Sequence, residues 1–488
     1  MSKRISIGLL LLSLGAQVGI TLKPIQAQTQ VAPTTTTKSI CLSKLPIAIN
    51  AITNRPQFNR MRWGISVQPL LSPQNIYSLD AQKYFTPAST AKLLTTAAAL
   101  QQLGANFRFR TSVYLSGKDL HVVGRGDPSL SDLQLIALAK QLSQKGIRQI
   151  NQLIVDDSYI RGEIVSPSWQ WEDIQSDYGA PINSLILNQN VFNLKLQPQT
   201  IGKPLQVVWT DINEAKQWQV INESVTTRED LPKSINITRD LSKPILRIQG
   251  QLTEKSNPEI VSLPVLAPAE YFLRHFRNAL AAEKITVAQA FVSAHRGKNE
   301  QEIAAVESPP LSQLLAETNL NSNNLFAEAS LRSLAVKKIP TDPNQSSADA
   351  GLEVMKATLT QLGVDPKTYV LVDGSGLSRK DLVTPEAFVQ ILRAMRRSPQ
   401  AEVYLASLPV AGKSGTLKNR FLHTPAVGVV HAKTGTMDGV VSLSGYVNAP
   451  QYSPIVFSII VNQTEQPIAV VRQAVDEIVV LLAQLQRC

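Results

Sequence analysis

One short stretch of the chain carries the residue types that acyl transfer requires. Ser89-Thr-Ala-Lys92 places a serine three residues before a lysine, and no other serine in the chain has a lysine at this spacing. Pro87 can open a helix, and the Ala/Leu-rich run 91–103 predicts a buried one. Because residues i and i+3 share a helix face, the pattern predicts a serine hydroxyl beside its own base.

Serine catalysis of this kind requires a neutral lysine. The ordinary pKa of lysine is about 10.4, and lowering it to about 7 costs roughly 4–5 kcal/mol. Burial and a second nearby cation would both lower the pKa. If Ser89 is the nucleophile and Lys92 its base, the sequence therefore predicts a desolvated pocket around Lys92.

A second group of residues, Ser322-Asn-Asn324, could complete the proton transfer. Ser322 could relay a proton between Lys92, Lys433 and the leaving amine, and Asn324 could hydrogen-bond a substrate amide. Taken alone, the same tripeptide also fits a turn followed by a helix N-cap. Ser234-Ile-Asn236 repeats the Ser-x-Asn pattern elsewhere.

A third group, Lys433-Thr434-Gly435-Thr436, suits recognition of a terminal carboxylate. A fixed cation with the hydroxyls of Thr434 and Thr436 supplies the donors that an anion needs. Gly435 allows a strand to approach the substrate backbone closely. The backbone N–H groups of Ser89 and Thr436 are the expected oxyanion donors. The near-copy Lys413-Ser-Gly415 is interpreted as a loop.

The beginning of the chain predicts export. Lys3 and Arg4 precede an apolar run over 5–14, and small residues follow as far as Ala27. This pattern is typical of a secretory signal peptide, assigned to residues 1–27, and places the mature protein in the periplasm or on the cell-wall side of the membrane. No later stretch is long and apolar enough to predict a transmembrane span.

Composition argues against several other functions. The net charge is +11, but the basic residues are scattered and do not resemble a nucleic-acid-binding module. Five histidines and two distant cysteines show no metal-ligand spacing, and no glycine-rich phosphate loop is present, so neither metal nor cofactor is expected. Cys41 and Cys488 could form a disulfide in an oxidising compartment or remain two free thiols.

Both ends of the chain predict parts of one α/β domain. After a flexible linker at 28–39, residues 40–104 contain two expected strands (62–70 and 76–80) and the helix at 91–103. Residues 299–488 supply the remaining elements, with expected helices at 311–316, 324–336, 348–362 and 468–485 and expected strands at 427–432, 440–447 and 456–461.

Residues 105–298 separate the first two motifs and predict an insertion of mixed strands and helices. Its expected elements are a hairpin at 108–124, helices at 133–146 and 267–283, and strands at 150–155, 191–196, 205–209 and 245–251.

Several further segments extend the similarity beyond the three motifs. The sequence resembles the class C low-molecular-mass penicillin-binding proteins, which are D-alanyl-D-alanine carboxypeptidase/endopeptidases with a large insertion. The resemblance spans about 45–482, and Asn323 stands where the commonest form of the second motif has Asp. The matching segments are Pro87-Ala-Ser-Thr-Ala-Lys-Leu, Gly124-Arg-Gly-Asp-Pro, Val155-Asp-Asp-Ser-Tyr, Tyr178-Gly-Ala-Pro, Ser322-Asn-Asn-Leu-Phe-Ala-Glu, Asp373-Gly-Ser-Gly-Leu-Ser-Arg and His431-Ala-Lys-Thr-Gly-Thr.

This resemblance implies a fold, a substrate and one more site residue. The fold would be an α/β (α+β) domain like that of serine β-lactamases and transpeptidases, and the substrates would be peptidoglycan peptides ending in D-Ala-D-Ala. β-Lactams would acylate Ser89 as covalent inhibitors. An acidic residue of the insertion would approach the site, with Asp156 (or Asp157) the candidate. The alternatives are a β-lactamase and a non-catalytic penicillin-binding scaffold.

Overall fold

The computed structural model describes residues 39–72, 74–240, 242–294, 301–337, 342 and 344–488. The predicted signal peptide at 1–27, and all of the predicted linker except Ser39, lie outside these residues. No helix in the described ranges is long and apolar enough to cross a membrane.

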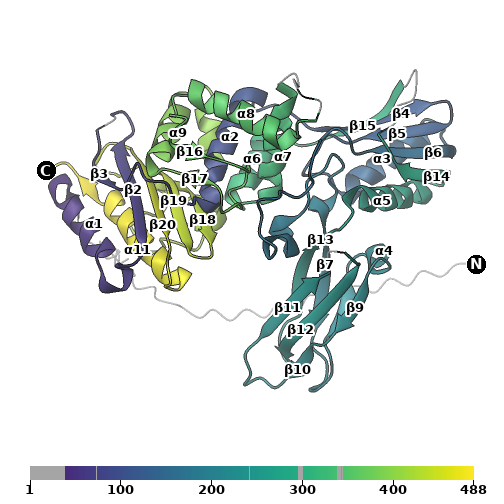
Figure 1. The fold of residues 1–488 in the computed structure, drawn as a ribbon, viewed down its shortest axis with the longest axis horizontal. Coiled ribbons are helices and arrows are strands. Elements are labelled where there is room, and N and C mark those ends of the chain that lie inside the picture. Colours follow the sequence, from purple (N-terminus) through teal and green to yellow (C-terminus); the bar gives the residue numbers. More distant parts are fainter. Residues whose placement is uncertain (1–38, 73, 241, 295–300, 338–341, 343) are drawn as a thin grey trace, which may run out of the picture. The chain divides into compact units, whose positions relative to one another are not determined.

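A five-stranded antiparallel sheet joins the two ends of the chain (Figure 1). Its order is β18-β19-β20-β2-β3, and β2 pairs with β20 from Arg62 opposite Asn462 to Pro69 opposite Ile455. An early strand therefore lies beside one almost 400 residues later. The strands are β2 (Arg62–Pro69), β3 (Tyr77–Leu79), β18 (Val430–Met437), β19 (Val440–Val447) and β20 (Ile455–Asn462).

Helices cover both faces of this sheet, which explains the apolar character of its central strands. Every residue of β19 and β20 is buried. Leu443 packs in one core with α1 (Leu45–Thr53) and α11 (Ile468–Ala483), whereas Tyr446 packs in another with α2 (Lys92–Leu103) and α9 (Pro385–Arg397). The layered α/β architecture confirms the expected fold class.

The second core continues into a group of helices around α2. These are α6 (Leu311–Leu320), α7 (Asn324–Leu334), α8 (Ser347–Gln361) and α10 (Ala401–Ala406), with a short hairpin of β16 (Tyr369–Val370) and β17 (Leu382–Val383) beside them. Ala97, Ala98 and Ala99 of α2 are fully buried, because small side chains let neighbouring helices approach on several sides. The helix that follows Ser89 is thus enclosed by protein.

One part of the inserted region is a second five-stranded sheet, of order β14-β6-β5-β4-β15. Two amphipathic helices, α3 and α5, pack in its core. The elements are β4 (Arg110–Ser116), β5 (Asp119–Val123), α3 (Asp132–Gln144), β6 (Gln149–Asp156), α5 (Pro268–Ala282), β14 (Thr286–Val292) and β15 (Gln301–Glu307). β15 follows the predicted boundary at residue 298, yet it pairs with β4.

The other part of the inserted region is made of short strands. β7 (Val191–Gln197), β8 (Gln206–Trp209) and β13 (Glu259–Pro264) form one sheet, and β9 (Gln219–Asn222), β10 (Val225–Thr227), β11 (Ser234–Arg239) and β12 (Ile245–Thr253) form another, with α4 (Ile212–Ala215) between β8 and β9. Leu196 and Ile248 share a small core between them. Ser234–Asn236, the repeat of the Ser-x-Asn pattern, lies in β11.

A disulfide between Cys41 and Cys488 ties the ends of the described chain together. It stands beside a two-residue parallel pairing of β1 (Ile40–Cys41) with β21 (Leu485–Gln486). Of the two states that the sequence allowed for these cysteines, the structure contains the disulfide.

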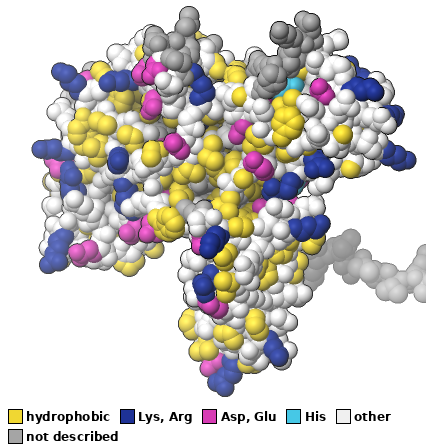
Figure 2. Space-filling view, turned by 45° about the vertical axis from the view of Figure 1, so that its right-hand side comes forward, with side chains coloured by type: hydrophobic (Ala, Val, Ile, Leu, Met, Phe, Trp, Pro, Cys, Tyr) yellow, Lys and Arg dark blue, Asp and Glu magenta, His cyan; other side chains and the backbone are white. Residues whose placement is uncertain are grey.

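Charged side chains are spread widely over one face of the protein. On the face that Figure 2 shows, Lys and Arg side chains stand singly among neutral and acidic ones.

Candidate active site

Ser89 lies in a strained turn that leads into α2. Residues Ala88–Ala91 form a single 3₁₀ turn, and Ala88 has a φ of 50°, which is uncommon for a residue other than glycine. The turn is held from both sides, because the hydroxyls of Thr90 and Ser442 donate to the Pro87 carbonyl at 2.7 and 2.6 Å. Strain kept in place by such contacts is typical of a functional site.

Lys92 is fully buried beneath Ser89 and contacts three oxygen atoms. Its Nζ lies 2.8 Å from Ser89 Oγ, 2.5 Å from Asn324 Oδ1 and 2.7 Å from the Ser375 carbonyl oxygen. A neutral amine has two N–H groups and one lone pair. When Asn324 and Ser375 accept the two N–H groups, the lone pair is left for the hydroxyl proton of Ser89.

The surroundings of Lys92 favour this neutral state. Burial lowers the pKa of Lys92 to about 7, although the carboxylates of Asp373, Glu328 and Asp381 favour the charged form. The free-energy cost of such a shift is roughly 4–5 kcal/mol. The desolvated pocket that the sequence predicts around Lys92 is present.

Lys433 occupies a similar buried position on β18. Its Nζ donates to Ser322 Oγ and to the Thr434 carbonyl, both at 2.8 Å. Burial, and then the proximity of Lys92, hold the pKa of Lys433 well below its ordinary value. An anionic group arriving beside Lys433 would reverse this effect, because an opposite charge favours the protonated amine.

The structure reconciles the two interpretations of Ser322-Asn-Asn324. Asn323 is the N-cap of α7, and its side chain accepts a hydrogen bond from the Phe326 N–H at 3.2 Å. The residues on either side of this cap face the site instead. Ser322 accepts from Lys433, and Asn324 contacts Lys92 through Oδ1 while its Nδ2 donates to the Tyr178 carbonyl at 2.9 Å.

β18 is an edge strand that runs against the Ser89 turn. A Cβ atom at Gly435 would lie 2.2 Å from Ser442 Oγ and 2.7 Å from the Pro87 carbonyl oxygen, so only glycine permits this approach. Thr434 Oγ1 donates to Thr416 Oγ1 at 2.8 Å, and Thr436 is exposed. β18 is the outermost strand, and residues 409–411 pair with its outer edge only from Val430 to Ala432. The rest of this edge, which includes Thr434 and Thr436, could pair with an extended ligand.

A cleft of about 710 Å³ lies in front of these groups. Ser89, Ser322, Asn324 and Thr436 line it directly, while Lys92 and Lys433 contact the lining from behind. The remaining lining residues are Ala88, Gln170, Glu172, Asp173, Tyr178, Gly376, Leu377, Arg379, Met437 and Asp438. The three motifs, each more than 100 residues from the next in the sequence, thus meet at one cleft.

Asp156 is not brought to this cleft. It ends β6, is 1% exposed, and accepts hydrogen bonds from the Ser158 N–H and hydroxyl at 2.8 and 2.5 Å. Burial raises its pKa, but the proximity of His121, at 3.6 Å, and the hydrogen bonds from Ser158 outweigh burial and lower the pKa to about 2. Asp157 is also turned elsewhere and accepts from Asn183 Nδ2 at 2.8 Å.

The acidic residues that the inserted region does place in the cleft are Glu172 and Asp173. They belong to a polar loop without regular alternation, which explains why the sequence pattern did not single them out. The carbonyl oxygens of Tyr178 and Ser375 were also missed, since a main-chain acceptor has no side-chain signature. Both, however, lie in segments that match the resembled family, Tyr178-Gly-Ala-Pro and Asp373-Gly-Ser-Gly.

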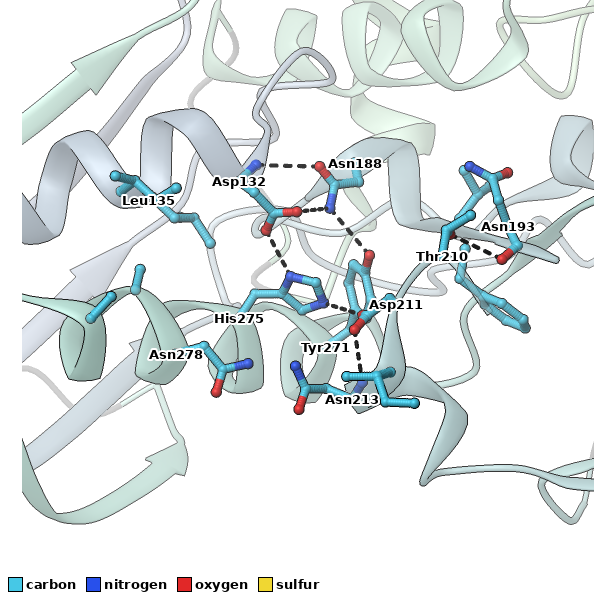
Figure 3. Close-up of a pocket in the computed structure, with 16 residues that line it drawn as sticks. Asp132, Leu135, Asn188, Asn193, Thr210, Asp211, Asn213, Tyr271, His275 and Asn278 are labelled. Carbon is cyan, nitrogen blue, oxygen red and sulfur yellow. Dashed lines mark hydrogen bonds and ion pairs between the residues drawn. The ribbon is translucent and has the colours of Figure 1, made fainter. Parts of the chain in front are cut away.

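The inserted region contains a separate cavity of about 650 Å³ between α3, α5 and the start of β7 (Figure 3). None of the predicted site residues lines it. His275 of α5 projects into it between two carboxylates, with Nδ1 2.7 Å from Asp132 Oδ1 and Nε2 2.9 Å from Asp211 Oδ2.

The sheet with helices on both faces, and the meeting of the three motifs at a cleft beside its edge strand β18, define a protein of the penicillin-binding and transpeptidase-like class. More specifically, residues 45–485 match the D-Ala-D-Ala carboxypeptidase 3 (S13) family, and the chain belongs to that family. This confirms the resemblance to class C penicillin-binding proteins and places the protein among the peptidases.

Two curated relatives and one solved structure show how far the similarity extends. A D-alanyl-D-alanine carboxypeptidase of Actinomadura sp. (strain R39) is 34% identical, over 91% of this chain and 85% of its own. A penicillin-sensitive carboxypeptidase A of Dictyostelium discoideum is 32% identical, over 87% of each chain. The crystal structure of penicillin binding protein 4 (dacB) from Haemophilus influenzae shares the fold, with a TM-score of 0.76, 23% identity and coverage of 91% of this chain and 98% of that one.

Proposed function

We propose that the protein is an exported serine D,D-peptidase that acts on peptidoglycan stem peptides. It would remove the terminal D-Ala, cut D-Ala cross-links, or do both, through an acyl-enzyme on Ser89. The observation that carries this proposal is the buried amine of Lys92, 2.8 Å from Ser89 Oγ at the edge of an open cleft. Family membership supports the type of substrate.

In acylation, Ser89 Oγ attacks the carbonyl carbon of the penultimate D-Ala while neutral Lys92 accepts the hydroxyl proton. Negative charge develops on the carbonyl oxygen, and the backbone N–H groups of Ser89 and Thr436 are the expected donors to it. The C–N bond then breaks, and the leaving amine receives a proton through Ser322, which is hydrogen-bonded to Lys433. Water then hydrolyses the ester, with the proton transfers of acylation running in the opposite direction, and Ser89 is released.

We assign the binding of the leaving D-Ala to residues of β18. Lys433, together with the hydroxyls of Thr434 and Thr436, would hold the terminal carboxylate, whose charge in turn keeps Lys433 protonated. The open edge of β18 can pair with an extended peptide backbone. Asn324 Nδ2 has one N–H occupied by Tyr178 and a second one free for a substrate carbonyl.

The acyl side of the substrate would meet the acidic part of the cleft. Glu172 and Asp173 line the cleft from the inserted region. Arg379, which lies outside the inserted region in the sequence, lines the cleft as well. Carboxylates of this kind favour a side chain that ends in an ammonium group, as the diamino acid of a stem peptide does. We expect Asp173→Asn to raise KM for a stem peptide with a free side-chain amine, and to leave KM for its N-acetylated form unchanged.

The first test is acylation of the purified mature protein by a fluorescent penicillin, together with hydrolysis of a pentapeptide and of cross-linked muropeptide dimers. The wild-type protein should be labelled in a one-to-one ratio and should release D-Ala or convert dimers to monomers. Ser89→Ala should lose both labelling and hydrolysis. Hydrolysis by the Ser89→Ala variant would refute the assignment of the nucleophile.

The same experiment separates the two alternatives. Rapid turnover of penicillin, with no action on peptides, would identify a β-lactamase. Stable labelling of Ser89 with no hydrolysis of any peptide would identify a non-catalytic penicillin-binding scaffold. The compartment is tested separately by N-terminal sequencing of the mature protein, where retention of Met1 would refute export by the predicted signal peptide.

A further inference from the structure

The inserted region contacts the acceptors of the catalytic lysine from behind. Lys92 has two acceptors besides Ser89, namely Asn324 Oδ1 and the Ser375 carbonyl oxygen. Tyr178 of the inserted region accepts a hydrogen bond from Asn324 Nδ2, which turns Oδ1 of the same amide towards Lys92. The second acceptor, Ser375, belongs to the loop 373–378, and a different residue of the inserted region supports that loop.

Asp373 determines the shape of this loop. It is 2% exposed, and its carboxylate accepts hydrogen bonds from three backbone N–H groups of its own loop: those of Ser375 at 3.0 Å, Gly376 at 2.7 Å and Ser378 at 2.8 Å. The loop also abuts the nucleophile turn, because a Cβ atom at Gly376 would lie 2.0 Å from the Ala88 carbonyl oxygen. A shift of Asp373 would therefore move both the acceptor of Lys92 and a neighbour of Ser89.

Trp169 supplies the fourth hydrogen bond to Asp373, and it comes from the inserted region. Its indole Nε1 lies 2.9 Å from Asp373 Oδ2. The ring is 8% exposed and packs against Leu325 of α7 and Leu377 of the loop. A buried carboxylate requires its full set of donors, since an incompletely paired buried charge is unfavourable.

We propose that Trp169 is a positioning residue for the general base: through Asp373 it holds the loop that presents the Ser375 carbonyl to Lys92. Without this support the loop relaxes, and the lone pair of Lys92 is no longer aimed at Ser89. The inserted region then does more than shape the cleft, because it orients both of the acceptors that fix the amine. This inference rests on the proposed role of Lys92 as the base for Ser89.

Several other charged groups face Lys92, and the test must account for them. Asp373, Glu328 and Asp381 favour the protonated form of Lys92, while Lys433 is a nearby competitor for protonation. Glu328 is itself paired with Arg332 and accepts from the Gly374 and Ser375 N–H groups. Loss of the Ser375 acceptor weakens the protonated form of Lys92, and this displaces the titration of Lys92 to lower pH.

The test compares Trp169→Phe with a matched control, Trp218→Phe. Trp218 is also 8% exposed in the inserted region, and its indole Nε1 also lies 2.9 Å from a buried carboxylate, that of Glu214. For each variant, the second-order rate constant of acylation by a penicillin is measured from pH 5 to 9. We expect Trp169→Phe to reduce the plateau roughly tenfold and to move the midpoint of the rise to lower pH. Trp218→Phe should stay within about twofold of the wild-type plateau with an unchanged midpoint.

A second replacement isolates the N–H group if Trp169→Phe does not fold. β-(3-Benzothienyl)alanine at position 169 keeps the ring shape and replaces the N–H by sulfur, and we expect it to show the same loss and the same displacement. An unchanged profile at position 169, or an equal change in Trp218→Phe, would overturn the inference while leaving the proposed function intact. Failure of the wild-type protein to be acylated would instead overturn the proposed function, and the role of Trp169 with it.

Discussion

At the residue scale, the proposed catalysis depends on a lysine that folding removes from water. Lys92 is 0% exposed, and its three contacts are all uncharged oxygens. Burial of this amine lowers the stability of the folded protein. The same burial makes Lys92 available as the proposed base near neutral pH.

The pH dependence of acylation follows from this environment. Burial lowers the pKa of Lys92 to about 7, so the reactive neutral fraction increases as the pH rises through that value. We expect the acylation rate constant to rise about tenfold per pH unit below pH 7 and to level off above it. Stability changes in the same direction, because between about pH 7 and the ordinary lysine pKa the unfolded chain binds the additional proton.

Lys92→Arg keeps the charge and abolishes this titration. Arginine remains protonated at every accessible pH, so the variant should lose roughly 10²–10⁴-fold in acylation rate and show no rise near pH 7. A stopped-flow pH profile of both proteins is the measurement. A Lys92→Arg variant that still acylated at a comparable rate would show that another group acts as the base.

Gly435 lets β18 lie close against the Ser89 turn. The added methyl group of Gly435→Ala would meet Ser442 Oγ and the Pro87 carbonyl, and β18 would have to move away from the Ser89 turn. We expect kcat/KM to fall roughly 10²–10³-fold, as for loss of one oxyanion donor, because the Thr436 N–H moves with the strand. The double variant Gly435→Ala/Ser442→Ala removes the closer clash and should recover part of the activity. Full activity of the single variant would contradict the close approach.

At the scale of elements, the inserted region has a junction of three helices that depends on one histidine. His275 of α5 lies between Asp132, the first residue of α3, and Asp211, the N-cap of α4. Burial alone would lower the pKa of His275, but hydrogen bonds and charges from Asp132 and Asp211 outweigh burial and raise it. In its protonated form His275 joins the three helices through two ion pairs.

The ion pairs of His275 stabilise the protein more at low pH than at high pH. Because the pKa of His275 is raised on folding, its contribution to stability is complete below the ordinary histidine pKa near 6.5 and is lost as the pH rises through the folded value. We expect His275→Gln to destabilise the protein by about 1 kcal/mol at pH 5.5 and by much less at pH 9. Hydrogen exchange of α3 and α5 at the two pH values measures this effect. The exposed His423→Gln is the control, and an equal loss at both pH values in His275→Gln would contradict the ion-pair role.

At the scale of the whole molecule, the two ends of the chain hold each other in place. β2 and β20 pair along their full lengths, α1 packs on α11, and the Cys41–Cys488 disulfide joins segments 447 residues apart. The pairing of β1 with β21 covers only two residues on each strand, so the disulfide is the main restraint at these ends.

Removal of this restraint should loosen the ends without affecting the cleft. We expect the double variant Cys41→Ser/Cys488→Ser to lose about 2–5 kcal/mol of stability and to exchange the amides of β1 and β21 faster. Penicillin acylation should remain at the wild-type rate, because α2 and α7 pack in a core that contains neither α1 nor α11, and β18 stays paired with β19 along its whole length. Addition of reductant should reproduce the effect in the wild-type protein and leave the variant unchanged. Loss of acylation in the variant would show that the closure of the chain also supports the site.

Much of the fold was predictable because its signals are local. The expected strands at 62–70, 440–447 and 456–461 match β2, β19 and β20, and the helix at 324–336 matches α7 apart from its last turn. α9 was missed although Thr384 caps it and Pro385 opens it. The short strands β9, β10 and β11 were missed because three to six residues carry little periodicity.

The sequence by itself determined the candidate site residues and the chemistry proposed for them. A serine three residues before a lysine, a Ser-x-Asn and a Lys-Thr-Gly are local patterns that can be recognised in the sequence alone. Only the tertiary structure decided which groups surround them. Asp156 is buried against Ser158, Glu172 and Asp173 take the cleft positions, and the Ser375 and Tyr178 carbonyls fix the base and its partner. The physical reason is that burial and hydrogen-bond geometry, which set the charge of Lys92, arise from segments that meet only in the folded chain.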